Sequence, residues 1–283
     1  MRRKYIYVGV KPQAFNEVIK FEELKYVHTF ALEGSFLHTR VRDTDFEHTI
    51  FRLKDKRDII RKLTEIEYDI LISGGCPFIL PVSKIKKPHQ LFVNTHRSFL
   101  PDLRGRHPVN GALLHKRRFT GVTMHYLDDG IDTGNIIYQE RFEITDDLDL
   151  GILHQALFDL EAKVFTIGMR RIIEANYEYP GEIQVGTDSY YSRSEKDMRV
   201  DFESMSDDEL MTRVRAFGVK SQGVSCTIND ECYKIFDAET VSNDYLLEKY
   251  AGFPCGALLL EYEDELLVKT GDGLIRVTSY EKK

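Results

Sequence analysis

Three polar side chains in this sequence have the types and spacing to do chemistry together. Asn94 and His96 end a short apolar run, and Asp132 follows in the loop sequence DDGIDTG. An Asn amide can donate to an oxygen that becomes negative, and an imidazole can donate or accept a proton. A carboxylate can fix the tautomer of the imidazole or raise its pKa. The set suits acyl transfer through a tetrahedral intermediate, although a loop Asp among glycines is more often a turn former.

Alternating strands and helices are predicted around these residues. Buried strands are predicted over 5–10, 68–75, 91–96 and 121–129, and helices over 13–24, 56–67 and 107–116. This alternation predicts an open, largely parallel α/β sheet, in which ligands bind beyond the carboxyl ends of the strands. Asn94 and His96 are expected at that edge. Asp132 is expected there too, because it directly follows the last of these strands.

The second half of the chain has a different pattern. A long helix is predicted over 148–177 and a polar linker follows it. Ser206 and Glu209 form a capping box for a helix that ends near Phe217. Short strand-like pieces then alternate to the end, with Gly271-Asp272-Gly273 as a hairpin turn. The predicted domains are 1–185, a linker over 186–200 and a small β domain over 201–283.

Composition excludes several broad classes. The 283 residues are 42% hydrophobic and 30% charged, as in an ordinary globular protein. A net charge of -7 argues against a surface coated with basic residues for nucleic acid. No apolar run reaches the length of a membrane span or a signal-peptide core. The four cysteines have neither CxxC spacing nor a disulfide pattern, so no metal site is predicted and a cytoplasmic protein with reduced thiols is expected.

The stretches VNTHRSFLPDLRGRHPVNGALL and TGVTMHYLDDGIDTGNIIYQ carry a longer pattern. It runs Asn-x-His, Ser-x-Leu-Pro, a loop with Gly105, and Asp-x-Gly-x-Asp-Thr-Gly. In this order it resembles the folate-dependent formyltransferases, the superfamily of methionyl-tRNA formyltransferase and the sugar-nucleotide N-formyltransferases. YDILISGGCPFILP resembles the strand and loop of that family that lie against the folate. The C-terminal sequence resembles the small domain of the methionyl-tRNA branch.

The resemblance implies a Rossmann-like formyltransferase domain with a mostly parallel sheet, plus a small C-terminal OB-like β-barrel. It implies 10-formyltetrahydrofolate as the cofactor and a primary amine as the acceptor. Asn94 and His96 would stabilise the oxyanion, and Asp132 would orient His96 and help to move the amine proton. The residues matched to the pterin pocket are Phe78, Leu80, Leu127 and Asp128. His125 either lines the same pocket or is a structural histidine.

The acceptor is narrowed by what the sequence lacks. The tRNA branch carries a basic, Gly-rich insertion after its second strand, and the region VHTFALEGSFLHTRVRDTDFEHTIFRL is short and mixed in charge. A Pro-Trp-Pro-like stretch that often follows the Arg-Ala-Phe helix in the tRNA and lipid-sugar branches is also missing, and the chain has no Trp. The favoured substrate is therefore a nucleotide-linked deoxyamino sugar used in polysaccharide biosynthesis, with no nucleic-acid or membrane partner. Arg104 and Arg106 either meet the phosphates of this substrate or are solvated loop charges.

Two enzymatic alternatives stay open at this point. Methionyl-tRNA formyltransferase is the first, and a hydrolase of formyltetrahydrofolate is the second, because the same three residues would serve water as the nucleophile. The oligomeric state is also open, with a homodimer through the C-terminal strands as one option.

Overall fold

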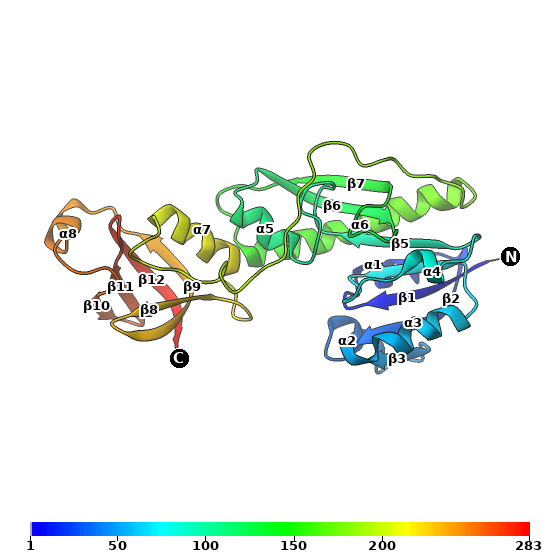
Figure 1. Cartoon of the computed structure of the whole chain (residues 1–283), viewed down its shortest axis with the longest axis horizontal. Helices are drawn as coiled ribbons and strands as arrows, with labels where there is room; N and C mark the ends of the chain where they lie inside the picture. The colour runs from blue at the N-terminus through cyan, green and yellow to red at the C-terminus, as the bar shows by residue number, and fades with distance from the viewer. Residues whose placement is uncertain (1) are drawn as a thin grey trace. The chain divides into compact units, whose positions relative to one another are not determined.

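The structure is a computed structural model that describes residues 2–283 and contains two β-sheets (Figure 1). The strands are β1 (Arg3–Gly9), β2 (Leu24–Leu32), β3 (His48–Phe51), β4 (Ile70–Gly74), β5 (Leu91–His96), β6 (Phe119–Tyr126), β7 (Ile136–Glu143), β8 (Val224–Ile228), β9 (Glu231–Thr240), β10 (Leu258–Tyr262), β11 (Glu265–Lys269) and β12 (Leu274–Lys282). The helices are α1 (Gln13–Val18), α2 (Phe36–Val41), the short 3-10 helix η1 (Leu53–Asp55), α3 (Lys56–Glu65), α4 (Val82–Ile85), α5 (Pro108–Leu114), α6 (Leu150–Glu174), α7 (Asp207–Phe217) and α8 (Asp244–Lys249).

The first sheet has seven strands in the order β3-β2-β1-β4-β5-β6-β7. The five strands from β3 to β5 pair in parallel, as the alternating pattern predicts. β6 and β7 are antiparallel to their neighbours. The sheet is therefore mostly parallel, and the residues of the predicted site come from β5, β6 and the loop after β6.

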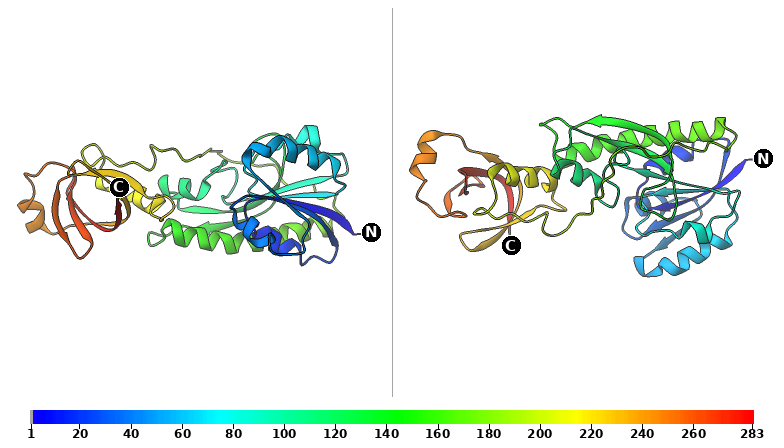
Figure 2. Two further views of the ribbon diagram at one scale, coloured as in Figure 1. Left: turned by 90° about the horizontal axis from the view of Figure 1, so that it is seen from below. Right: turned by 45° about the horizontal axis from the view of Figure 1, so that its top comes forward.

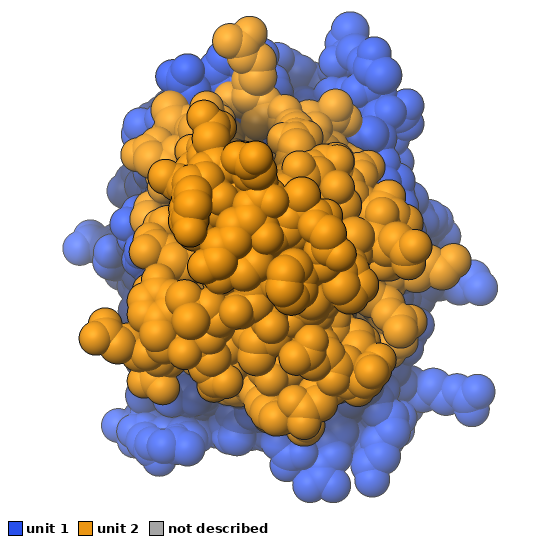
Figure 3. Space-filling view, turned by 90° about the vertical axis from the view of Figure 1, so that its left-hand side faces the viewer, with its two compact units in different colours: residues 1–105, 119–143, 155–190 blue, residues 106–118, 144–154, 191–283 orange. Residues whose placement is uncertain are grey.

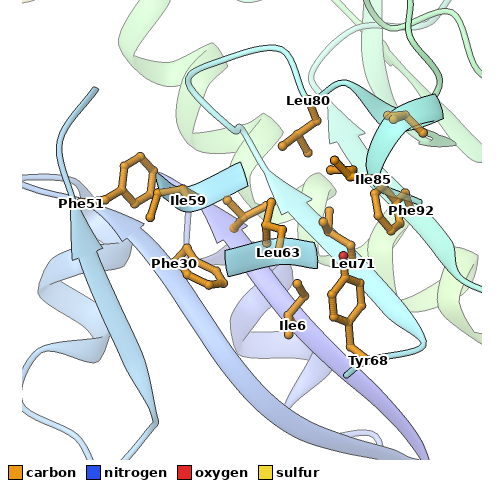
Figure 4. Packing of buried hydrophobic residues seen from close by; sticks show 12 residues of the cluster. Ile6, Phe30, Phe51, Ile59, Leu63, Tyr68, Leu71, Leu80, Ile85 and Phe92 are labelled. Atoms are coloured by element: carbon orange, nitrogen blue, oxygen red, sulfur yellow. The ribbon is translucent and has the colours of Figure 1, made fainter. Parts of the chain in front are cut away.

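Side chains alternate between two covered faces of this sheet. Ile6 and Val8 pack with Ile59 and Leu63 of α3 and with Phe92 in one buried cluster (Figure 4). On the opposite face, Tyr7 lies against Phe15 of α1, with ring centroids 5.4 Å apart. Figure 2 shows α3 and α4 on one side of the sheet and α1 and α6 on the other. This two-sided burial explains why the central strands are almost continuously apolar.

One local prediction was wrong, and one feature of the sheet was left open by the sequence. The helix predicted over 13–24 ends at Val18, and Leu24 already begins β2. The segment that follows is rich in aromatic and β-branched residues, which favour a strand. The sequence left the direction of β6 open, and the helix predicted over 107–116 could have been a crossover to a parallel strand. That helix, α5, instead packs against α7, and β6 returns antiparallel to β5.

The chain divides into two compact units, coloured separately in Figure 3. Residues 1–105, 119–143 and 155–190 form the first unit, and residues 106–118, 144–154 and 191–283 form the second. The second unit contains an antiparallel five-stranded sheet in the order β10-β11-β12-β9-β8. The predicted capping box is present at its helix α7, where Ser206 and Glu209 bond each other's backbone N–H groups. The domain limits at 185 and 200 stay a prediction.

Candidate active site

Strand β5 carries the first two residues of the predicted set. Phe92, Asn94 and His96 share one face by strand alternation, and Thr95 faces the opposite side. Asn94 and His96 are buried, at 8% and 6% exposure, although they stand at the carboxyl end of the strand. Polar groups buried this far need partners, and β6, the loop after β6 and the loop after β5 supply them.

Asp132 lies beside β5 because the loop after β6 folds back along that strand. The antiparallel register places Tyr126, the end of β6, beside Val93 in the middle of β5. The following loop then runs back, and Gly134 lies so close to Tyr126 that a Cβ on it would be 2.0 Å from the Tyr126 carbonyl oxygen. Asp132 itself has φ of 54°, a left-handed conformation that is uncommon outside glycine. The close approach at Gly134 and the left-handed backbone at Asp132 together fix the position of the Asp132 carboxylate.

Four contacts tie the Asp132 carboxylate to its surroundings. Its Oδ2 accepts from the Gly105 backbone N–H at 3.0 Å and lies 3.4 Å from Nδ1 of His96. Its Oδ1 lies 3.5 Å from Nδ2 of Asn94 and 3.5 Å from Nε2 of His125. The structure therefore brings Asn94, His96 and Asp132 together around one carboxylate, with His125 as a fourth member.

His125 fixes the orientation of the Asn94 amide. Nδ1 of His125 is 2.7 Å from the Tyr126 carbonyl oxygen, so this nitrogen carries the proton and donates. Nε2 then has a free lone pair, and Asn94 Nδ2 lies 3.1 Å from it. The amide must present its NH2 group to this lone pair. One hydrogen of Asn94 is thereby used, and the second points toward Asp132 along the longer contact.

His96 is held in the opposite tautomer. Its Nε2 donates to the Leu103 carbonyl oxygen at 2.9 Å, which leaves Nδ1 with a lone pair in the neutral ring. That lone pair faces Oδ2 of Asp132 at 3.4 Å, a distance longer than a charge-assisted hydrogen bond.

Burial lowers the pKa of His96 below its ordinary value, and His125 and Lys11 act in the same direction against Asp132 and the Leu103 carbonyl. Burial alone would raise the pKa of Asp132. His96, His125 and the Gly105 N–H outweigh it, and the pKa of Asp132 lies well below its usual range. At neutral pH the pair is a neutral imidazole beside an ionised carboxylate.

Residues 38–167 match the model of the formyl transferase family, and residues 193–283 match the model of the formyl transferase C-terminal domain. The chain belongs to the formyltransferase superfamily. The sequence motif around Asn94 and Asp132 lies within the first match.

Several named proteins are similar to this formyltransferase. Methionyl-tRNA formyltransferase from Caldanaerobacter subterraneus subsp. tengcongensis is 27% identical over 235 residues, which cover 82% of this chain and 72% of the relative. A solved N-formyltransferase from Helicobacter canadensis, in complex with folinic acid and dTDP-3-aminofucose, has a TM-score of 0.68 at 23% identity and covers 100% of both chains. HypX from Aquifex aeolicus, in complex with tetrahydrofolic acid, has a TM-score of 0.67 at 13% identity, and this chain covers 45% of it. At these identities the structural likeness shows a shared fold.

The residues predicted for the cofactor pocket of this formyltransferase divide into two groups. Leu80 belongs to the apolar cluster of Figure 4, and Phe78 and Leu127 are half-buried against it. Asp128 is exposed and accepts from the Gly130 N–H at 3.0 Å and from the Thr133 hydroxyl at 2.7 Å. These bonds hold the shape of the loop that carries Asp132. A role of Asp128 toward a cofactor stays a prediction.

The two predicted phosphate ligands have different surroundings. Arg104 Nη1 forms an ion pair with Asp188 at 2.9 Å, and its Nη2 donates to Gln184 at 2.7 Å. Its guanidinium group is therefore already engaged in binding residues of the 182–190 segment. Arg106 is exposed and belongs to the second unit. Substrate binding by either arginine stays a prediction.

Sequence reasoning left Lys11, Thr95 and Glu161 out of the site. They lie in contact behind β5, where Thr95 Oγ1 donates to Glu161 Oε1 at 2.5 Å. A Glu in the middle of the apolar stripe of a long helix was the signal that could have found them. Among residues 2–283, no group of His, Cys, Asp and Glu is placed to hold a metal ion.

No helix in the described part of the chain is both long and apolar enough to cross a bilayer.

Proposed function

We propose that this formyltransferase transfers a formyl group from 10-formyltetrahydrofolate to the primary amine of a nucleotide-linked deoxyamino sugar. The choice of acceptor rests on the length and charge of the segment between β2 and β3, residues 33–47. In place of a long basic loop, this segment holds the six-residue helix α2 and four acidic residues.

The two arginines of this segment have partners within the chain. Arg40 donates from Nε to Asn16 at 2.8 Å and lies over the Phe15 ring. Arg42 pairs with Asp43 at 2.9 Å. A protein that binds a tRNA backbone needs several Lys or Arg side chains that are free to neutralise phosphates. This neutralisation supplies most of the affinity. The segment therefore favours a small acceptor over tRNA.

The formyl donor is proposed from two lines of support. The solved N-formyltransferase and HypX carry folinic acid and tetrahydrofolic acid, respectively. In this chain, Phe78 and Leu127 leave part of their apolar surface uncovered beside the buried cluster, and Ile79 between Phe78 and Leu80 is 55% exposed. An apolar lining with a few polar groups suits a flat heteroaromatic ring. The residues present fit the proposed donor, which supplies the activated formyl group.

Asn94 stabilises the developing negative charge in this proposal. Its Nδ2 is oriented by His125, and its second hydrogen has only the 3.5 Å contact to Asp132. That hydrogen is available to the formyl oxygen as the amine attacks. A donor fixed before the reaction needs no reorganisation, and one such donor is worth about 3 kcal/mol.

The His96–Asp132 pair accepts the proton that the amine sheds. Nδ1 of His96 has the lone pair, and Asp132 lies beside it to stabilise the imidazolium. The C–N bond to the acceptor forms, the bond from the formyl carbon to the donor nitrogen breaks, and the pair returns its proton to that nitrogen. Proton transfer by a positioned base and acid typically contributes 10²–10⁴-fold in rate.

The decisive experiment measures tetrahydrofolate release from 10-formyltetrahydrofolate by the purified protein. A panel of nucleotide-linked amino sugars and charged methionyl-tRNA are compared with a reaction that contains no acceptor, and Asn94→Ala is the inactive control. Release that depends on one amino sugar supports the proposal and names the acceptor. Release that depends only on methionyl-tRNA, the acceptor of the curated relative, would overturn it. Release without any acceptor would identify a hydrolase.

A further inference from the structure

A surface segment, residues 182–190, crosses the two loops that carry the candidate site, and we call it the strap. At one end, Glu182 pairs with Ile136 of β7, where each backbone N–H donates to the other residue's carbonyl oxygen at 2.7 Å. At the other end, the Ser189 carbonyl oxygen accepts from the Arg104 N–H at 2.9 Å. The strap is therefore fixed both to the loop after β5 and to the first residue of β7.

Only two side chains of the strap turn inward. Gln184 and Ser189 are partly buried, whereas the other residues of the strap are exposed. The exposed residues include the apolar Ile183 and Val185 on either side of Gln184, at 77% and 83% exposure. A segment that exposes apolar side chains and turns polar ones inward reverses the usual pattern of burial. Hydrogen bonds therefore hold the strap against the site.

Gln184 uses its whole hydrogen-bonding capacity on the two loops. Its Nε2 donates to the carbonyl oxygens of Asp132 and Gly134, both at 2.8 Å. Its Oε1 accepts from Nη2 of Arg104 at 2.7 Å and from Nε of the same guanidinium group at 3.3 Å. The orientation of the amide is forced, because carbonyl oxygens only accept and a guanidinium group only donates. One side chain thus joins the loop after β5 to the loop after β6.

The same two loops make the contacts that define the His96–Asp132 pair. The Gly105 N–H donates to Asp132 Oδ2 at 3.0 Å, and the Leu103 carbonyl oxygen accepts from His96 Nε2 at 2.9 Å. Ser189 Oγ in turn accepts from the Leu103 N–H at 2.9 Å. The strap therefore bonds to the main chain on both sides of the pair.

Each of these loops also holds a residue in the left-handed region of backbone conformation. Asp132 has φ of 54°, and Leu103 has φ of 56°. This conformation is unfavourable for a residue with a Cβ, above all for a bulky one, and it persists only where surrounding contacts hold it. Gln184 bonds to the carbonyl oxygen of Asp132, and Ser189 bonds to the N–H of Leu103. The two inward side chains of the strap thus contact the two strained residues.

We propose that Gln184 is a positioning residue for formyl transfer: it ties the loop after β5 to the loop after β6, and so holds the Asp132 carboxylate beside His96. The inference rests on the catalytic role proposed above for the His96–Asp132 pair. Gln184 acts through the main chain of Asp132 and not on a reacting atom.

The first test measures hydrogen exchange of the Gly105 amide in the ligand-free protein, which needs no knowledge of the acceptor. In Gln184→Ala this amide is expected to exchange about ten-fold faster, because the carboxylate that accepts its hydrogen bond is no longer held. Amides of β4 should exchange as in the wild type. Gln184→Glu keeps the length of the side chain and an acceptor for Arg104 but cannot donate to the two carbonyl oxygens, so it should also speed exchange at Gly105. Thr187→Ala is the matched control, because Thr187 is an exposed residue of the same strap.

The second test is a double-mutant cycle on turnover with the acceptor identified in the panel. Gln184→Ala alone should lower kcat by about 10²-fold and leave KM for the donor near the wild-type value, because a misplaced catalytic group slows the reaction without removing a binding contact. In the Asp132→Asn background, the same change should have little further effect. Two changes that act through one carboxylate are not additive, whereas a general structural defect would lower turnover in both backgrounds.

Unchanged exchange at Gly105 in both Gln184 variants would overturn the inference, and so would a full loss of kcat from Gln184→Ala in the Asp132→Asn background. If Gln184→Ala does not fold, Gln184→Glu, which is closest in size, decides the question by the same two measurements. If no amino sugar is turned over, the proposed acceptor is wrong, and the exchange at Gly105 still decides whether Gln184 positions Asp132.

Discussion

The two sheets of this protein differ in where they place charged side chains. At the carboxyl end of β5, in the first sheet, Asp132 and Glu161 are removed from water and contact other polar or charged side chains. In the second sheet, the ion pairs are on the surface: Arg276 pairs with Glu239 at 2.6 Å, and Lys282 pairs with Glu231 at 2.5 Å. The interior of the second sheet is apolar, with Ile275 and Val277 fully buried.

This difference in the placement of charge distinguishes the sheet that carries the candidate site from the sheet without it. Exposed ion pairs add little to stability, because water and salt screen them. Buried charges destabilise a fold unless they are paired, and strongly perturbed groups in a cluster mark functional sites. We therefore propose that the first sheet carries the reactive edge and that the second sheet is a structural module. Each prediction below tests this division.

Asp132→Asn is expected to have the largest effect on the reaction. The change keeps the shape of the side chain but removes the charge that stabilises protonated His96, so turnover should fall by about 10³-fold. The measurement is the rate of tetrahydrofolate release with the acceptor identified in the panel. Asp129→Asn is the control on the same loop, since Asp129 is exposed and accepts from the Ser83 backbone N–H at 3.1 Å, away from His96. Near wild-type turnover in Asp132→Asn would remove Asp132 from the mechanism.

Ile275→Ala should affect the second unit alone. Ile275 on β12 is fully buried, and truncation of a buried Ile to Ala typically costs about 2–5 kcal/mol. Hydrogen exchange should show faster opening of β9 and β12, with β4 and β5 unchanged. Turnover below the melting temperature should remain that of the wild type. A loss of turnover in the folded variant would mean that the second unit takes part in the reaction, and the division between the sheets would fail.

Much of the fold was predictable, because periodicity and turn signals are local. The strands at β4 and β5, the long helix α6 and the Ser206 capping box were all predicted from sequence, and the structure confirms them. The direction of β6 was not predictable. Strand pairing depends on where α5 packs, and α5 packs on a helix that is about 100 residues away in sequence.

The residues of the candidate site were predictable from the sequence, but their tautomers and charge interactions were not. Asn94, His96 and Asp132 stand out through motif and spacing, and they do meet. The tautomers of His96 and His125 depend on carbonyl oxygens at Leu103 and Tyr126, which a sequence does not position. Glu161 meets Lys11, Thr95 and Arg97 only in the packed sheet, because these residues are far apart in the sequence.

Ser206→Ala is expected to have the smallest effect and gives the sharpest test of the division. Ser206 Oγ accepts from the Glu209 N–H at 3.2 Å, and Glu209 returns a bond to the Ser206 N–H at 3.1 Å. Loss of an N-cap hydroxyl typically costs about 1 kcal/mol, so the denaturant midpoint of the second unit should fall slightly. Ser204→Ala is the control, because Ser204 precedes the helix and its hydroxyl donates to Asp201 instead.

The Ser206 change adds and removes no charge. It should therefore leave the turnover and the titration of His96, followed by NMR, unchanged. If the His96 titration moved with this cap, the electrostatics of the first sheet would depend on the second unit, and the two regions would have to be treated as one system.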